Sequence, residues 1–567
     1  MGLLQPNLPV VDHDVWDHQS RRDRMRPLAR HYAEHGFGSP DVVILLYALK
    51  VVAFAALGWA LILSTPGIDG WTDPAAWFRR PEAFAKAALF TMLWEVLGLG
   101  CGFGPLNGRF LPPLGTFLYW LRPRTVRLPP FGGRVPLTGG DERRPVDVAL
   151  YAAFLVATAW ALWGPLSRAE VAVVLALLVV VGLRDQVIFL AARGEVYGPL
   201  ALTFLFADGD RLVAAKLALL VVWWGAAVSK LNRHFPFVLA TMLANSPFWR
   251  VGGLKRRLWR DVPDDLRPGP LAAAIAHGAT LVELVAPAVL LVVTDGPVQV
   301  VAAAALVAFH LGILSSFPMG VPLEWNVFMI WGAITLDLGH PGLPLGDVAH
   351  PAAVLAVPVA MAAVVVVGNL VPSRVSFLPA MRYYAGNWAT TTWCFRGDAA
   401  DRLADGIVKA GLLPHRQLVA VYGDEQQAAV PLTMGQVFRG FHAHGRAIWS
   451  LVPRACGGDH EERLVLDGEL VAAAVLGWNF GDGHLHDERL VEALQRRCGF
   501  GPGDLRVVVL ESQPAGSPDQ AYRLVDAATG CIERGTVAVA DLTARQPTDV
   551  DVPATVTWSR ADGGYER

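Results

Sequence analysis

The sequence contains nine blocks of mostly apolar residues, each of about 17–25 residues, the length at which an α-helix crosses a hydrocarbon core of roughly 30 Å. The backbone of a segment in lipid must satisfy its own hydrogen bonds, so each block is predicted to be a helix. The predicted spans are 42–65, 83–105, 147–163, 170–192, 211–229, 271–294, 298–314, 322–338 and 352–371. The predicted fold is therefore an all-α polytopic membrane bundle, with a soluble α/β domain after it.

Composition supports a membrane location. Only 17 % of the residues are charged, whereas an ordinary soluble protein carries roughly 25 %. We expect a lipid bilayer, and specifically the cell membrane, as the surroundings. The net charge of −2 gives no basic footprint for nucleic acid, so no nucleic-acid partner is expected. The five cysteines form no CxxC pair, so no zinc or thioredoxin-like site is predicted.

Three regions follow from the distribution of charge. Residues 1–41 form a basic tail with five arginines between Arg21 and Arg30, predicted to be solvated near anionic headgroups in the cytoplasm. Residues 42–372 form the bundle. Residues 388–567 contain no spanning block and are predicted to be a soluble α/β domain, with a strand at Leu418–Tyr422, another at Leu505–Leu510 and a helix over Asp487–Cys498.

The sequence leaves two possibilities for the side of the membrane on which the C-terminal domain lies. The connections 106–146 and 230–270 are both basic, which favours the cytoplasm for each, but nine spans place them on opposite sides. If the apolar piece Tyr197–Ala207 also crosses, the second connection and the C-terminal domain become cytoplasmic. Eleven residues fit a re-entrant half-helix better. Nine crossings and an extracytoplasmic C-terminal domain are therefore favoured.

Eight ionisable residues lie within or at the ends of these spans, where such groups usually face a bundle interior or a cavity. They are Glu95, Arg184, Asp185, Lys230, His277, Glu283, His310 and Glu324. For each one, the simpler alternative is a structural ion pair or a satisfied buried hydrogen bond. Glu95 is a possible partner for Arg184.

The grouping of these residues points to a shared pocket. Lys230 ends the fifth span, Glu283 lies in the first half of the sixth, and His310 is near the end of the seventh. In antiparallel neighbours these positions fall in the same half of the bilayer, together with His277 and Glu324. Burial favours a neutral lysine, which is a base, and a nearby imidazole or carboxylate can relay a proton. Lys230, His310 and Glu283 are the candidate catalytic residues, and the other five are candidate pocket residues.

Two His-x-His pairs follow the bundle. His442 and His444 form one, and His484 and His486 form the other, just before Asp487. On a strand such a pair points both rings to one side, as a metal site requires. No third ligand is identifiable, so surface-loop positions are favoured, with Asp487 as a helix N-cap. No metal is predicted.

Four segments resemble the vitamin K-dependent gamma-carboxylase superfamily, also called the horizontally transferred transmembrane domain (HTTM) superfamily, in the same order and at similar spacing. They are VYGPLALTFLFAD at 196–208, GAAVSKLN at 225–232, HGATLVELVAPAVLLVV at 277–293 and Phe309–His310. The resemblance covers residues 184–331. It implies that Lys230 corresponds to the lysine regarded as the base that deprotonates reduced vitamin K. It also places Glu283 on an acidic position and implies a quinone-like lipid as substrate or cofactor.

The chain also departs from that superfamily. Arg193 stands about where the enzyme has a histidine, and Asn232 replaces an acidic residue. The C-terminal domain is unlike the carboxylase's β domain, so glutamate carboxylation is not implied. The whole chain more closely resembles an actinobacterial family of transmembrane proteins of unknown function, through WNFGDGHLHDE at 478–488 and YRLVDAATG at 522–530.

Two classes of function fit these features. One is a membrane enzyme that uses Lys230 as a base on a lipophilic, quinone-like small molecule. The other is a non-catalytic transporter or cell-envelope scaffold whose soluble domain recruits partners. Many transporters carry paired helix-breaking motifs in two matching halves. None is visible in the sequence, which favours the enzyme.

Overall fold

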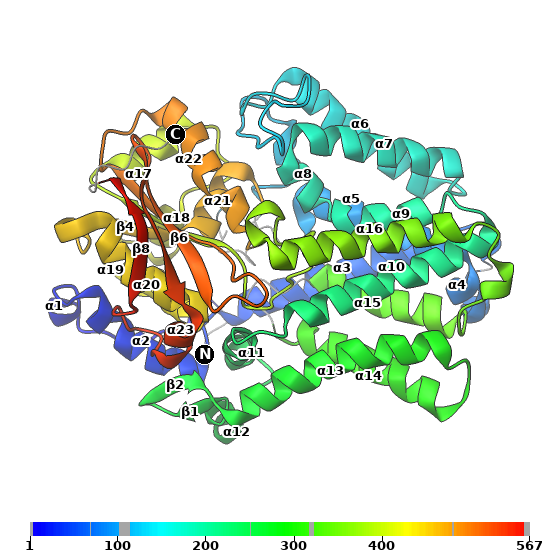
Figure 1. Cartoon of the computed structure of the whole chain (residues 1–567), viewed down its shortest axis with the longest axis horizontal. Helices are drawn as coiled ribbons and strands as arrows, with labels where there is room; N and C mark the ends of the chain where they lie inside the picture. Colours follow the sequence, from blue (N-terminus) through cyan, green and yellow to red (C-terminus); the bar gives the residue numbers. More distant parts are fainter. Residues whose placement is uncertain are drawn as a thin grey trace.

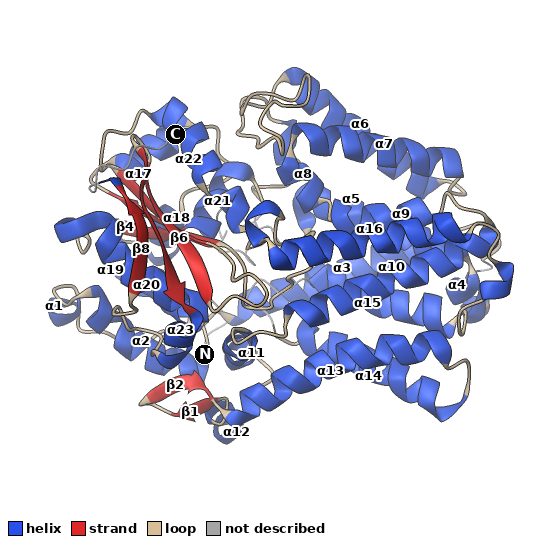
Figure 2. Ribbon diagram, viewed as in Figure 1, coloured by secondary structure: helices blue, strands red, loops and turns tan. Residues whose placement is uncertain are grey.

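The computed structural model describes residues 4–68, 70–100, 111, 114–249, 251–316, 323–478 and 481–560. The molecule has two parts that lie side by side (Figure 1). One is a bundle of long helices. The other surrounds a six-stranded sheet built from the C-terminal third of the chain (Figure 2).

Six of the described helices are long and apolar enough to cross a membrane. They are α3 (Asp41–Leu63), α6 (Pro145–Trp163), α10 (Asp208–Ser229), α13 (Pro270–Val292), α14 (Gly296–Leu314) and α16 (Pro351–Leu370). Each coincides with a predicted span. The chain is thus a multi-pass membrane protein, but the count of nine spans is not confirmed.

The other three predicted spans are interrupted helices. Helix α5 (Pro81–Trp94) continues as a π-helical turn at Glu95–Leu99, and residues 101–105 lie outside the described residues. Helix α7 (Arg168–Arg184) is separated from α8 (Gln186–Ala191) by an extended Asp185. Helix α15 (Leu323–Gly332) continues as a π-helical segment, Ala333–Leu338. A buried acid, Glu95, Asp185 or Asp337, marks each interruption.

Two shorter apolar helices complete the bundle. Helix α9 (Gly194–Thr203) packs against α5, α7 and α10, so the segment predicted to be re-entrant is shielded by protein, as its length requires. Helix α11 (Phe235–Asn245) follows α10 and packs against α13. Both place side chains next to the site described below.

The sheet has the order β4-β3-β5-β6-β7-β8 and is antiparallel throughout. Its strands are β3 (Thr390–Phe395), β4 (Leu464–Asp467), β5 (Leu505–Leu510), β6 (Asp519–Asp526), β7 (Gly530–Ala538) and β8 (Ala554–Ser559). The accompanying helices are α17 (Ala399–Gly406), α18 (Pro414–Tyr422), α19 (Glu425–Phe441), α20 (Ala443–Cys456), α21 (Gly468–Leu476), α22 (Glu488–Cys498) and α23 (Val539–Ala544).

The predicted elements of this domain are partly confirmed. The strand at Leu505–Leu510 and the helix ending at Cys498 are present. The predicted strand Leu418–Tyr422 is wrong, because those residues form the end of α18. Pro414 is pre-organised for the first turn of that helix, and Gly423 ends it with φ 102°.

The central strand β3 is buried on both faces. Trp393 and Phe395 belong to the apolar core that continues into the bundle. Cys394, which points the opposite way, belongs to a second core with α19 and α20. The division at residue 388 stays a prediction.

The N-terminal segment differs from the expected solvated tail. Helix α2 (Arg21–His35) packs on α19 and α11 and buries Met25, Leu28 and Tyr32. The Tyr32 hydroxyl donates to the Thr241 carbonyl at 3.0 Å. These apolar residues recur at helical spacing among the arginines, so one face of a basic helix is a packing surface.

The basic segments and the C-terminal domain gather at one end of the bundle (Figure 1). Helix α2 contacts α19. Trp120, in the first basic connection, donates to the Leu476 carbonyl at 2.9 Å. The second connection contains the hairpin β1 (Trp259–Asp261) and β2 (Asp265–Pro268), in which the Leu266 amide donates to Gln546 at 2.9 Å. These contacts hold the N-terminal helix and the C-terminal domain at the same end of the bundle, whereas the sequence predicted them on opposite sides of the membrane.

Candidate functional site

A chamber of about 660 Å³ lies between helices of the bundle. Helices α10, α11, α13, α14 and α15 and the segment after α16 form its walls. Most of the lining side chains are apolar or aromatic, with few polar groups among them, as is usual in ligand sites.

Local sequence fixes Lys230 at the rim of this chamber. Helix α10 ends at Ser229, whose hydroxyl donates to the Met381 carbonyl at 2.9 Å. Asn232 then accepts from the amides of His234 and Phe235, at 2.7 and 3.0 Å, and so starts α11. Lys230 sits in this tight turn with 7 % of its surface exposed.

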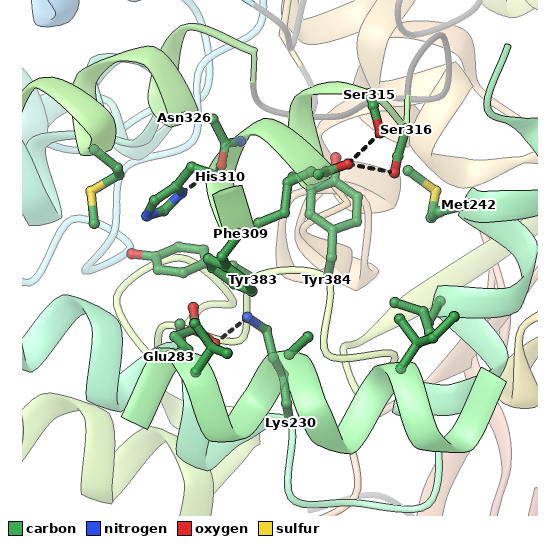
Figure 3. Close-up of a pocket in the computed structure, with 18 of the residues that line it drawn as sticks. Lys230, Met242, Glu283, Phe309, His310, Ser315, Ser316, Asn326, Tyr383 and Tyr384 are labelled. Atoms are coloured by element: carbon green, nitrogen blue, oxygen red, sulfur yellow. Dashed lines mark hydrogen bonds and ion pairs between the residues drawn. The ribbon is translucent and has the colours of Figure 1, made fainter. Parts of the chain in front are cut away.

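Glu283 of α13 meets Lys230 inside the chamber (Figure 3). The Lys230 Nζ lies 2.5 Å from the Glu283 Oε2, and both side chains are buried. The rings of Phe235 and Phe309 lie 5.7 and 5.5 Å from the same nitrogen. These surroundings strengthen the attraction between the two groups, because they exclude water.

His310 of α14 lines the same chamber with both ring nitrogens engaged. The Trp223 indole donates to Nε2 at 3.0 Å. An indole N–H can only donate, so Nε2 accepts and Nδ1 carries the hydrogen. Nδ1 then donates to the Asn326 Oδ1 at 2.8 Å. The imidazole is therefore held in one neutral tautomer, and it can relay a proton only if one of these bonds opens.

Glu324 is buried elsewhere in the bundle. Its carboxylate lies 3.0 Å from the Lys50 Nζ and accepts from the Trp94 indole at 3.2 Å. Glu95, the neighbour of Trp94, is also buried. Neither acid lines the chamber. The structure therefore does not bring them together with Lys230; Glu324 instead contacts Lys50 of α3 and Trp94 of α5.

Arg184 and Asp185 form structural ion pairs at the end of α7. The Arg184 Nε lies 2.5 Å from the Asp147 Oδ1. Asp185 pairs with the buried Arg143. The expected pairing of Arg184 with Glu95 is therefore wrong, and neither Arg184 nor Asp185 lines the chamber.

His277 is exposed on α13 and does not line the chamber. It lies six positions before Glu283. At about 100° per residue this separation turns the two side chains to different helix faces. Position along the helix therefore did not predict the direction of the His277 side chain.

Sequence reasoning missed several groups around the chamber. Arg193 pairs with Glu195 at 2.8 Å and lies over the rings of Trp325 and Tyr383, at 4.4 and 5.2 Å. Both rings line the chamber. The arginine and the glutamate stand two residues apart in an apolar stretch of the sequence, and that pattern could have predicted a buried ion pair. Tyr383 and the adjacent Tyr384 follow the last span, so a search of the spans omits them.

An apolar groove of about 490 Å³ runs between α13 and α14. Val282 and Ala305 line both this groove and the chamber. Leu281 and Val301, also in the groove, are 60 % and 66 % exposed. The chamber therefore adjoins a lipid-facing apolar surface.

The two His-x-His pairs are not on surface loops. His442, His444 and His486 are buried, and the first two rings are stacked with their centroids 5.3 Å apart. The expected cap is present, because Asp487 accepts from the Arg489 amide at 3.0 Å and starts α22. Among the described residues, no group of three histidine, cysteine or acidic side chains could hold a metal.

Comparison with known families gives one match. The model of a family described as transmembrane protein of unknown function (DUF3556) matches residues 1–557. The chain belongs to this family. No curated protein and no solved structure matches. None of these comparisons links the DUF3556 chain to the gamma-carboxylase superfamily, so that resemblance stays a sequence-based prediction.

Proposed function

We propose that this protein is a membrane-embedded enzyme that uses the Lys230–Glu283 pair as a proton acceptor for a lipophilic substrate. The observation that carries the proposal is the 2.5 Å contact between these groups on the wall of a mostly apolar chamber. The resemblance to the carboxylase superfamily adds independent support, since Lys230 falls on the lysine regarded there as the base.

The chemistry follows from the proton count of the pair. An amine and a carboxylate at this distance share one proton, and when Glu283 holds it the neutral Lys230 amine can accept one more. A substrate hydroxyl that reaches the pair breaks its O–H bond, and the proton binds to the pair. The resulting ammonium stabilises the substrate oxyanion, which is strongly favoured where water is excluded. A quinone-like lipid in its reduced, hydroxyl-bearing form belongs to this class of substrate.

We also propose that the C-terminal domain and the N-terminal segment are cytoplasmic. The arginine-rich segment 21–30 and the described residues of the basic connections, 114–146, 230–249 and 251–270, all lie at the end of the bundle that bears this domain. Basic connections favour the cytoplasmic side. With this arrangement both basic connections lie on the cytoplasmic side, whereas nine crossings would place them on opposite sides of the membrane.

The test of the enzyme proposal is substitution of Lys230 by arginine. Arginine preserves the charge and the contact with Glu283 but does not give up its proton at any workable pH. Lys230→Arg is expected to abolish complementation of a strain that lacks the gene, while protein abundance and melting temperature stay near wild type. Lys409→Arg, a lysine of the C-terminal domain outside the chamber, is the matched control and should complement.

Full complementation by Lys230→Arg would remove the proton-acceptor role. The transporter or envelope-scaffold function would then be favoured. Loss of complementation by both arginine variants would point to an effect unrelated to the chamber, and would also count against the proposal.

A further inference from the structure

A second cavity, of about 690 Å³, lies where the bundle meets the C-terminal domain. Its walls come from the end of α7, from α8, from the segment after α16 and from the GDGHLHDE loop before α22. It shares no lining residue with the Lys230 chamber. The role proposed for Lys230 does not involve this cavity.

One wall of this cavity is apolar and continuous with the lipid-facing surface. Val179 and Leu183 come from the last turns of α7, and Phe189 comes from α8. Val179 is 55 % exposed, and Phe131, from the first basic connection, is 50 % exposed. Since α7 is an apolar helix of the bundle, this wall is suited to contact an acyl chain.

Two arginines also line the cavity. Arg374 follows α16, is exposed and has no ion pair among the described residues. Arg489 donates to the His484 carbonyl at 2.6 Å and to the Gln186 Oε1 at 3.3 Å, and it remains 40 % exposed. Its Nε also lies 3.6 Å from the Asp487 Oδ1, so each guanidinium nitrogen has a protein partner, and the exposed edge of the group can still donate to another acceptor.

His484 also lines the cavity, with its charge paired by two carboxylates. Its Nε2 lies 3.1 Å from Glu511, and its Nδ1 lies 3.4 Å from Asp482. These carboxylates outweigh the effect of burial and raise the pKa of His484 to about 10. Neither acid lines the cavity. The acid that does, Asp487, is engaged as the N-cap of α22.

We propose that this cavity binds the phosphate headgroup of an anionic phospholipid, with the phosphate between Arg374 and Arg489 and an acyl chain along Val179 and Leu183. Guanidinium groups bind phosphate through paired, charge-assisted hydrogen bonds. Cationic side chains at the membrane surface select anionic lipids. The apolar wall favours a lipid over a soluble phosphate, because a free anion would leave that wall uncovered.

The bound lipid would connect the two parts of the protein. Arg489 belongs to the C-terminal domain, whereas Val179 and Leu183 belong to the bundle. A headgroup held by both sides would stabilise the junction between them.

The test is native mass spectrometry of the full chain in detergent, titrated with dioleoylphosphatidylglycerol or dioleoylphosphatidylcholine. The wild type is expected to prefer phosphatidylglycerol. Each surface arginine contributes about 1 kcal/mol toward anionic lipid, so Arg374→Gln with Arg489→Gln should weaken phosphatidylglycerol binding about 30-fold. Arg374→Gln alone keeps the Arg489 contacts with Gln186 and His484 and should weaken it about fivefold.

Arg257→Gln with Arg260→Gln is the matched control. Both arginines are exposed in the second basic connection at the same end of the bundle and lie outside the cavity. The control should bind phosphatidylglycerol as the wild type does. Equal loss in the two double variants, or unchanged binding in both, would overturn the proposal. Displacement of phosphatidylglycerol by an excess of inorganic phosphate would assign the cavity to a soluble anion instead.

Discussion

Lys230 at the end of α10 and Glu283 in α13 are 53 positions apart in the chain, yet their charged atoms lie 2.5 Å apart in a buried chamber. The contact needs α10 and α13 to run side by side, which they do. It also needs the turn at Ser229–Asn232 to hold Lys230 over the chamber. The same contact explains why a chemical role and a structural role must be separated by experiment.

Apolar replacement of the pair separates these roles. Removal of one partner of a buried ion pair leaves an uncompensated charge and costs about 3–5 kcal/mol. Lys230→Met is therefore expected to lower the melting temperature clearly in detergent, whereas Lys230→Met with Glu283→Met should restore most of it. Neither variant should complement. A double variant less stable than Lys230→Met would show that the pair contributes to folding as a unit.

The groove between α13 and α14 is expected to be the route by which substrate enters. Ala305 lines both groove and chamber, whereas Ala304 is exposed and lines neither. Ala305→Trp should therefore abolish complementation, and Ala304→Trp, the same change one position earlier, should not. Comparable melting temperatures of the two proteins would exclude misfolding. If Ala305→Trp complements fully, substrate enters elsewhere.

His484 is expected to stabilise the C-terminal domain in a pH-dependent way. Its carboxylate neighbours raise its pKa to about 10, above the ordinary value near 6.5. The pair with His484 lowers the pKa of Glu511 to about 2, below its ordinary value near 4.3. The contribution of His484 to the free energy of unfolding is complete below about pH 6.5 and disappears as the pH rises toward 10. The contribution of Glu511 disappears as the pH falls from about 4 toward 2.

His484→Gln tests this contribution. The difference in melting temperature from wild type should be largest between about pH 4.5 and 6.5 and should shrink at pH 9. At a pH where both groups are charged, loss of one partner from a buried pair lowers the free energy of unfolding by about 3 kcal/mol. A difference that does not vary with pH would show that His484 acts through packing and not through its charge.

The orientation predicts which engineered thiols are accessible from outside the cell. Gly458 lies in an exposed turn of the C-terminal domain, and Asp295 lies in the exposed connection of α13 and α14 at the opposite end of the bundle. With native cysteines replaced by alanine, Asp295→Cys should react with an impermeant maleimide on intact cells, and Gly458→Cys only after lysis. The reverse pattern would place the C-terminal domain outside.

Residues 388–567 are expected to fold without the bundle, because they contain no spanning block. The fragment would lose its contacts with Trp120 and Tyr119, so its melting temperature should be lower than that of the same domain in the full chain. Circular dichroism and gel filtration of the fragment would test this. An unfolded, insoluble fragment would make the domain and the bundle one folding unit.

The sequence by itself determined the membrane class and the six long spans, and it predicted a shared depth for the ionisable residues. Hydrophobic length fixes whether a helix can cross a bilayer, and position along a span fixes depth. These quantities are local, so Lys230, Glu283 and His310 could be assigned to one half of the bilayer before any contact was known. The apolar spacing within α2 was also present, but the surrounding arginines concealed it.

Tertiary structure decided which of those residues meet. Rotation about a helix axis and the choice of neighbouring helices turn Glu283 into the chamber and leave His277 outside it. They also pair Glu324 with Lys50 and Arg184 with Asp147. The side shared by the N-terminal helix and the C-terminal domain depends on packing between segments about 400 positions apart, such as the bond from Arg21 to Glu461, for which the separation is 440. Hydropathy describes each helix alone, and such contacts arise only when helices pack together.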